Sequence, residues 1–226
     1  MAIICRKQKL LFIMTPRTAC TALADVLVRE LGGEYLPTEP ILDEKGFFKV
    51  QSKHCTLSDL HQSGIITKEE TDSYTKFTTV RNPFDSIVSR YEKLRSKYQP
   101  FIDDPESWVH KVPGFVDNMH YCESHSFNNW VQKTYRRTAI KRLLGGKPSM
   151  YRRFTDGMDA VIPFENIQPA LDDFTANQNP PFKLEIPRIN TTSERSADYR
   201  KYYNSTSRMI VQFALKDDFK NYGYSF

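Results

Sequence analysis

Two arginines follow short apolar segments, and each stands before a stretch with helical spacing. Arg17 lies in the turn PRTACT, after LLFIM, and Arg81 follows KFTTV and precedes NPFDSIVSRY. A turn from a strand into a helix gathers backbone N–H groups at the positive end of the helix dipole, where anions bind. The pair therefore predicts a ligand that carries phosphate-like groups at two separated places.

The turn that holds Arg17 continues with small residues: Thr18, Ala19, Cys20 and Thr21. Small residues let the backbone wrap closely around a phosphate, and hydroxyls add donors. A Walker A loop is excluded, because GxxxxGKS/T is absent here and residues 145–148 (GGKP) lack the Ser or Thr. Taken alone, the motif fits an ordinary turn with a solvated arginine equally well.

The turn that holds Arg81 has a strong helix start, with Asn82 at the N-cap and Pro83 at the first helical position. Ser89 follows about two helical turns later, so its side chain and that of Arg81 are expected to converge on one anion beside the sheet. Pairing of Arg81 with Asp85, and simple packing of Ser89, is the alternative for this motif alone.

Four strands are expected at 10–14, 47–51, 76–80 and 160–164, and helices at 22–31, from Thr56, from Pro83, around 127–144 and at 167–174. The tail 196–222 is predicted to form one or two helices, with a break near Asn204. Alternating strands and helices predict an α/β fold, a three-layer sandwich with a mostly parallel central sheet. Such sheets bind ligands at the carboxyl ends of their strands, where both arginine turns fall.

With 226 residues the chain suits a single domain (1–226), with an irregular excursion at about 98–122. No stretch approaches the roughly 20 apolar residues of a membrane-spanning helix, and the N-terminus is too short and too charged for a signal peptide. We therefore expect a cytoplasmic protein without membrane insertion. The four cysteines are widely spaced and predict free thiols and no metal site. A net charge of +5 fits a small polyanion, and no nucleic acid is expected.

The order of these motifs resembles the sulfotransferase superfamily that uses 3′-phosphoadenosine 5′-phosphosulfate (PAPS), particularly its carbohydrate and membrane-type branch and the soluble bacterial relatives. The motifs run PRTACT, a histidine, VRNPFDSIVSRY, VIPFENI, PRINTTSERS and NYGYSF, so the resemblance covers 10–226. It implies a P-loop-like phosphosulfate site made by Arg17, Thr18, Ala19, Cys20 and Thr21. Cys20 departs from the Ser, Gly or Thr usual in the family, and its thiol is a weak donor.

The resemblance also implies that Arg81 and Ser89 grip the 3′-phosphate and that the segment 188–193, with Thr191 and Thr192, closes over the nucleotide. The expected reaction is an in-line displacement at sulfur, in which Arg17 balances charge that grows on the 5′-phosphate. No metal is required. PAPS is then the co-substrate and a hydroxyl group the acceptor; the oligomeric state is left open.

His54 is the expected general base. It follows the strand expected at 47–51, which would place it on the same sheet edge as both arginine turns, and a neutral imidazole suits base work near pH 7. Family members often place a histidine or glutamate in this region. Lys53 is a second candidate, for orienting the sulfate.

Other functions stay open at this point. The His54–Cys55 pair is reminiscent of tyrosine phosphatases, but His61 stands where their arginine would be. A P-loop-like nucleotide kinase is a weaker alternative. A non-catalytic module could bind anionic polymers through the basic pairs at 136–137, 141–142 and 152–153. The acceptor is expected to be a carbohydrate, with small phenols or alcohols as alternatives if an aromatic pocket forms from Tyr98, Phe101, Trp108, Phe115 and Tyr121.

Overall fold

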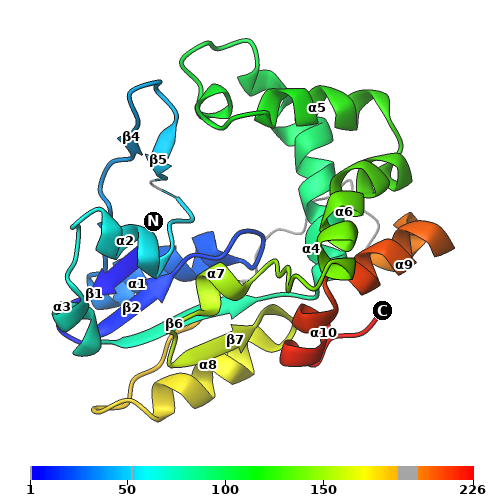
Figure 1. The fold of residues 1–226 in the computed structure, drawn as a ribbon. Coiled ribbons are helices and arrows are strands. Elements are labelled where there is room, and N and C mark those ends of the chain that lie inside the picture. Colours follow the sequence, from blue (N-terminus) through cyan, green and yellow to red (C-terminus); the bar gives the residue numbers. More distant parts are fainter. Residues whose placement is uncertain (1, 52, 188–197) are drawn as a thin grey trace. The chain divides into compact units, whose positions relative to one another are not determined.

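A computed structural model describes residues 2–51, 53–187 and 198–226 (Figure 1). The chain divides into two compact units. The first comprises Met1–Asp43, Phe48–Arg81 and Tyr151–Asn190, and the second Glu44–Phe47, Asn82–Met150 and Thr191–Phe226. The first unit contains two clusters of buried hydrophobic side chains and the second unit contains one, so each unit has hydrophobic packing of its own.

The first unit is built on a five-stranded sheet in the order β3-β1-β2-β6-β7. Its strands are β1 (Ala2–Cys5), β2 (Leu10–Ile13), β3 (Glu34–Leu36), β6 (Thr75–Val80) and β7 (Ala160–Pro163). β2, β6 and β7 are parallel neighbours, while β1 is antiparallel to both β2 and β3. Among the described strands of this sheet only β1 is reversed, so the predicted mostly parallel sheet is confirmed. The carboxyl ends of β2, β6 and β7 share one edge.

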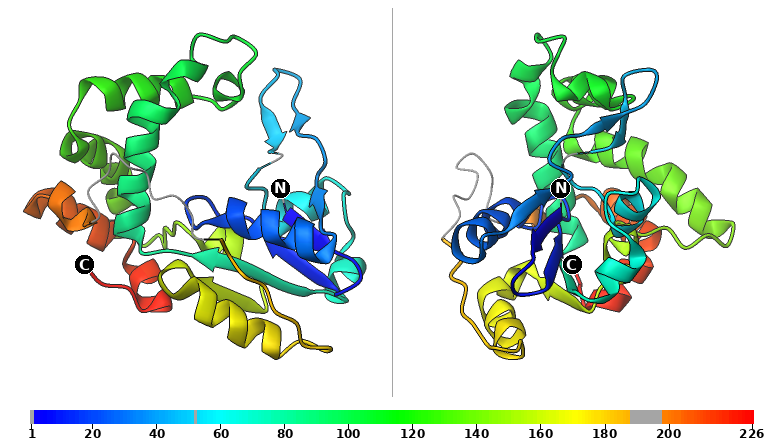
Figure 2. Two further views of the ribbon diagram at one scale, coloured as in Figure 1. Left: turned by 180° about the vertical axis from the view of Figure 1, so that it is seen from behind. Right: turned by 90° about the vertical axis from the view of Figure 1, so that its left-hand side faces the viewer.

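Helices cover both faces of this sheet, because alternate residues of each strand point to opposite sides. Phe12 and Phe77 pack on one side against α1 (Cys20–Leu31) and α8 (Ile167–Ala176). Figure 2 shows α8 lying along β7. Leu11 and Ile13 pack on the other side, where α2 (Leu57–Gln62) and α7 (Arg152–Thr155) contribute buried side chains. The first unit therefore has the three layers that the sequence predicts.

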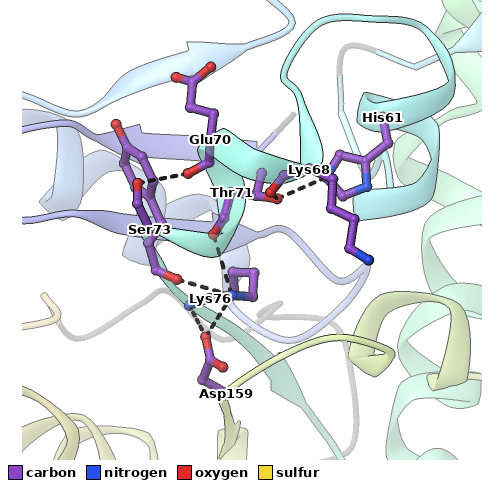
Figure 3. A network of polar contacts seen from close by, with 8 residues as sticks. His61, Lys68, Glu70, Thr71, Ser73, Lys76 and Asp159 are labelled. Atoms are coloured by element: carbon purple, nitrogen blue, oxygen red, sulfur yellow. Dashed lines mark hydrogen bonds and ion pairs between the residues drawn. The ribbon is translucent and has the colours of Figure 1, made fainter.

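A polar network holds the amino-terminal ends of β6 and β7 in register (Figure 3). The Lys76 backbone N–H donates to the Asp159 carboxylate at 2.7 Å, and Lys76 Nζ lies 3.2 Å from the same group. Nζ also donates to the carbonyl oxygens of Tyr74 and of Thr71, the latter in α3 (Lys68–Asp72). These bonds fix the register that sets Val80 opposite Pro163 at the carboxyl edge.

The strand expected at 47–51 forms, but outside the central sheet. β5 (Phe48–Val50) pairs with β4 (Ile41–Leu42) in a separate two-stranded antiparallel sheet. Val50 is the buried residue of β5, whereas Lys49 is exposed, so the strand lacks the two buried faces of a central position. The placement of His54 through a strand of the main sheet was therefore wrong.

The second unit is helical. It contains α4 (Pro83–Glu92), the π-helical turn η1 (Lys93–Lys97), α5 (Phe115–Ser124), α6 (Phe127–Leu143), α9 (Ser205–Ala214) and α10 (Lys216–Tyr222), with short 3-10 turns at η2 (Gln99–Phe101), η3 (Trp108–Lys111) and η5 (Tyr199–Tyr202). Its core gathers around Phe84 and Trp130, and the Phe226 ring lies 4.8 Å from that of Phe84. Asn82 caps α4 by accepting from the Phe84 N–H at 3.0 Å, as predicted.

The irregular excursion expected at 98–122 is only partly irregular. Its last part is helix α5, in which Met119 and Cys122, three residues apart, are buried. The prolines and glycine before it hide this short helical spacing. In the part of the chain that the structure describes, no helix has the length and apolarity to cross a membrane.

Candidate active site

The turn between β2 and α1 has an unusual backbone. Arg17 has φ 70° and Ala19 has φ 60°, so two residues with side chains adopt the left-handed region within three positions. This conformation costs about 1–2 kcal/mol for each L-residue other than glycine. A chain keeps such strain mainly where function needs it. Left-handed residues that alternate with others also turn successive N–H groups toward one point, which makes a concave anion site.

The same turn leaves the start of α1 without a side-chain cap. Ala19 stands at the N-cap, where its side chain has no oxygen to accept a hydrogen bond, and the first turn of α1 holds no acidic residue. By contrast, Thr56 caps α2 and Asn82 caps α4 through side-chain oxygens. The first N–H groups of a helix have no intrahelical acceptor, so the start of α1 can donate to an anion.

A set of threonine hydroxyls fixes the turn to the sheet. Thr18 Oγ1 donates to the Thr15 carbonyl at 2.8 Å and lies 2.5 Å from Thr79 Oγ1. Thr78 Oγ1 donates to the Ile13 carbonyl, and Thr15 Oγ1 lies 2.7 Å from Thr78 Oγ1. Each hydroxyl has one proton, so Thr79 donates to Thr18 and Thr15 donates to Thr78. The buried Thr18 hydroxyl is thus used within the protein, and a ligand would meet the Thr18 backbone instead.

Arg81 lies against the same turn. Its Nη1 donates to the Arg17 carbonyl at 3.1 Å, and its guanidinium stacks 4.2 Å above the Phe164 ring. The Arg81 carbonyl accepts from the Tyr151 hydroxyl at 2.6 Å. One hydrogen bond therefore joins the two arginine turns, at the sheet edge where the sequence predicts both. Phe164 and Tyr151 had no signal in the sequence that linked them to Arg81.

His54 reaches the end of β2 by another route than the one predicted. Its Nδ1 lies 2.9 Å from the carbonyl oxygen of Met14, the residue directly after β2. Since a carbonyl only accepts, Nδ1 carries the proton and Nε2 carries the lone pair. Burial lowers the pKa of His54 to about 3, against a raising effect of the Met14 bond and with further lowering from the Lys53 and Arg17 charges. The imidazole is neutral at physiological pH, as a base must be.

Positive charge gathers near this turn. Lys53 and Arg17 act electrostatically on both His54 and Cys20. Burial outweighs them at Cys20 and raises the pKa of its thiol, which packs in the core with Leu23. The Cys20 side chain therefore belongs to the hydrophobic core. Cys55 is also buried, and burial raises the pKa of its thiol. Its Sγ–H donates to the Leu36 carbonyl. These conditions disfavour the thiolate that a tyrosine phosphatase uses as its nucleophile.

Four candidates remain: Thr21, Ser89, Thr191 and Thr192. Ser89 is buried on α4, in the second unit, and its convergence with Arg81 stays a prediction. Thr21 is exposed at the start of α1. Thr191 and Thr192 lie outside the described residues. Within those residues, no three His, Cys, Asp or Glu side chains gather as a metal site would need.

The comparison with protein families gives a match. The family model described as the sulfotransferase family matches residues 1–225, nearly the whole chain. No curated protein matches the sequence. No solved structure matches it either. Because the family match covers all but the last residue of the chain, the chain belongs to the sulfotransferase family, a family of PAPS-dependent enzymes.

Proposed function

We propose that this enzyme transfers the sulfuryl group of PAPS to a hydroxyl acceptor by in-line displacement. The observation that carries the proposal is the turn at residues 14–20, with two left-handed residues before an uncapped helix. In the reaction the acceptor oxygen forms a bond to sulfur, the bond from sulfur to the 5′-phosphate oxygen breaks, and the acceptor proton passes to the base. Adenosine 3′,5′-bisphosphate (PAP) leaves with the bond electrons.

The 5′ end of the donor would lie on this turn. The backbone N–H groups of Ala19, Cys20 and Thr21 supply fixed donors, and the Arg17 guanidinium supplies charge where the leaving phosphate becomes more negative. The threonine hydroxyls beneath the turn hold this backbone in place without taking part themselves. The turn matches the donor's chemistry because donors that are fixed beforehand need no rearrangement during the reaction.

The 3′-phosphate is assigned to Arg81 and Ser89. Arg81 bears a permanent positive charge and a planar fork of donors, which suits two phosphate oxygens. Its stacking on Phe164 holds the guanidinium plane. Thr191 and Thr192 are proposed to close over the nucleotide, on the strength of the family resemblance alone. A 3′-phosphate site is what would distinguish PAPS from ATP.

His54 is proposed as the general base, acting through Nε2. Its low pKa means that the imidazole is neutral, and that burial and the neighbouring cations make it a weak base. Phosphate and sulfate charges near the ring would raise that pKa, because an opposite charge favours the imidazolium. The base would thus become stronger when the donor is bound. Lys53, whose charge acts on His54, is proposed to attract the sulfate end of the donor.

For the acceptor we propose a carbohydrate hydroxyl. The motif style of the carbohydrate branch supports this choice. Four of the five aromatic candidates form one cluster, with Trp108 5.1 Å from Tyr98 and 4.9 Å from Phe115, and Phe101 at its edge. Tyr121 stacks on His125 instead. A partly exposed ring cluster offers flat faces on which a sugar can stack, and it offers phenols the same surface.

Calorimetry with PAP tests the donor assignment, and ATP is the matched control because it lacks the 3′-phosphate. We expect PAP to bind at tens of micromolar or tighter and ATP to bind at least about tenfold more weakly, which one lost charge-assisted contact explains. Equal affinity for both nucleotides would favour a kinase, and no binding of PAP would refute the donor assignment. A screen with radiolabelled PAPS over sugars, phenols and alcohols then identifies the acceptor class.

A further inference from the structure

The outward side of helix α6 carries an unusual stripe. Its members recur every three or four residues and so lie on one face of the helix: Lys133, Arg136, Arg137, Ile140, Leu143 and Leu144. All six are exposed. We call this face the α6 stripe. The stripe changes from basic to aliphatic side chains toward the end of the helix. Exposed aliphatic side chains are unfavourable in water.

The apolar end of the stripe is strongly exposed. Leu143 and Leu144 are 75% and 81% exposed, and Ile140 is 48% exposed. The neighbouring helix α9 adds Met209 and Phe213, which lie four residues apart on its outer side. These five make up most of the large exposed hydrophobic side chains in the described ranges. Such a concentration marks an interaction surface, because scattered exposed apolar residues are the ordinary case.

α6 and α9 pack side by side within the second unit (Figure 1). Asn128 Nδ2 donates to the Tyr202 carbonyl, and Asn128 Oδ1 accepts from the N–H of Asn204, the N-cap of α9. At the other end, Arg142 Nε donates to the Ala214 carbonyl at 3.1 Å. The two helices therefore run in the same direction, and their apolar ends meet near Ala214.

The charge around this surface has one sign. α6 contains five basic residues (Lys133, Arg136, Arg137, Lys141 and Arg142) and α9 contains Arg208, while neither helix contains Asp or Glu. The carboxylates of α10 do not offset them at the surface. Asp217 pairs with Arg142 at 2.7 Å, and the buried Asp218 accepts from Ser149 and from the Met150 N–H. Among these three described helices, no carboxylate therefore offsets the exposed cations of α6.

We propose that the α6 stripe and the outer side of α9 dock the enzyme on an anionic lipid membrane. Basic side chains attract acidic headgroups, and exposed leucine, isoleucine, methionine and phenylalanine side chains enter the interface, which together is the chemistry of a surface-bound helix. The binding is peripheral and spans nothing. It is independent of the proposed reaction, so either conclusion can fail without the other.

Two other occupants fit less well. A second copy of the chain would set these cations against one another across a two-fold axis, and like charges in apposition oppose association. An anionic polymer would satisfy Arg136 and Arg137 but would leave Leu143 and Leu144 in water. A membrane accounts for both the charge and the apolar side chains.

Co-sedimentation with vesicles tests the proposal. The probes are phosphatidylcholine vesicles with about 30% phosphatidylserine and vesicles of phosphatidylcholine alone. We expect the full chain to bind the first at least about tenfold better than the second, and to lose this preference at high salt. Leu143→Ser with Leu144→Ser, and separately Arg136→Glu with Arg137→Glu, should each weaken binding by about tenfold or more.

Matched controls keep the test specific. Leu42→Ser removes an exposed leucine of β4, and Arg95→Glu with Lys97→Glu reverses two exposed charges of η1; both should bind vesicles like the wild type. Unchanged melting temperature and PAP binding of each variant show that it is folded. Failure of the wild type to bind the acidic vesicles would overturn the proposal. So would wild-type binding by the double serine variant, or a dimer in ultracentrifugation that the serine changes dissociate.

Discussion

The Nδ1 atom of His54 donates to the carbonyl oxygen of Met14, 2.9 Å away, directly where β2 passes into the turn that holds Arg17. This bond selects the tautomer with the lone pair on Nε2. If Nε2 is the base, His54→Ala should lower kcat by about 10²–10⁴-fold. PAP affinity should stay near the wild-type value, because the imidazole is neutral and makes no charge pair with the nucleotide. Single-turnover sulfation and calorimetry with PAP measure the two quantities.

His120→Ala is the matched control for that change, since His120 is exposed on α5 and its Nδ1 lies 3.9 Å from the carboxylate of the exposed Glu123. It should alter neither quantity. An active His54→Ala enzyme would show that another residue is the general base.

His54 should also make the protein less stable in mild acid. Its pKa is about 3 when folded and near its ordinary 6.5 when unfolded, so between these values the unfolded chain binds the extra proton. Stability from this group is present above pH 6.5 and falls as the pH drops, by about 2 kcal/mol between pH 7 and pH 5. Urea unfolding at both pH values measures the loss, and His54→Gln should remove it. An equal loss in the Gln variant would contradict the assignment.

Arg81→Ala should weaken PAP binding by about 1–3 kcal/mol, which is the usual contribution of a charge-assisted hydrogen bond. Arg81→Lys should recover only part of it, because lysine keeps the charge and loses the planar fork that stacks on Phe164. ATP binding should change less than PAP binding. Arg29→Ala, at an exposed position of α1, is the control. An Arg81→Ala variant with unchanged PAP affinity would remove Arg81 from the site.

Ala19→Gly should raise the free energy of unfolding by about 0.5–1 kcal/mol, because glycine relieves the left-handed strain but makes the unfolded chain more flexible. Ala22→Gly, inside α1, should lower it by about 1 kcal/mol and serves as the control. Thermal and urea unfolding measure both. If Ala19→Gly is destabilising, the turn is not strained at this position.

Substitutions of Thr18 and Thr21 should distinguish an effect on stability from an effect on PAP binding. Thr18→Val breaks the hydroxyl set with Thr79 and should cost about 1–3 kcal/mol of stability, since it leaves buried polar groups without partners. Thr21→Val changes an exposed hydroxyl and should alter stability by less than about 0.5 kcal/mol. Any loss of PAP affinity in the Thr21 variant then reports a direct contact. A stable Thr18→Val protein would refute the role given to the set.

The strands next to the site could be predicted because their patterns are local. The run at 10–14 and the Asn82–Pro83 helix start each carry their signal within a few residues, and both are present in the structure. The reversed strand β1 and the short β3 were missed. Their four and three residues have no distinctive period, and only pairing across the sheet shows that they are strands.

In the candidate site too, some residues could be predicted from the sequence and others could not. Arg17, Arg81 and His54 could be found from residue type and position, although the reason given for His54 relied on a strand that lies in another sheet. The partners of these residues could not be found: Met14 contributes a carbonyl, which every residue has, and Tyr151 and Phe164 come from distant parts of the chain. A pair of threonines within the buried strand β6 was the one usable signal for the hydroxyl set.

The hydroxyl set of these threonines also has a consequence for the rate at which PAP associates. The hydroxyl bonds of Thr15, Thr18, Thr78 and Thr79 lie within the protein and hold the turn in its strained form, so a donor that binds there as proposed meets a turn that is already shaped. The encounter then requires no slow ordering of the turn, and electrostatic attraction to the basic residues sets its speed. The association rate of PAP should therefore depend steeply on ionic strength, whereas its dissociation rate should depend on it little.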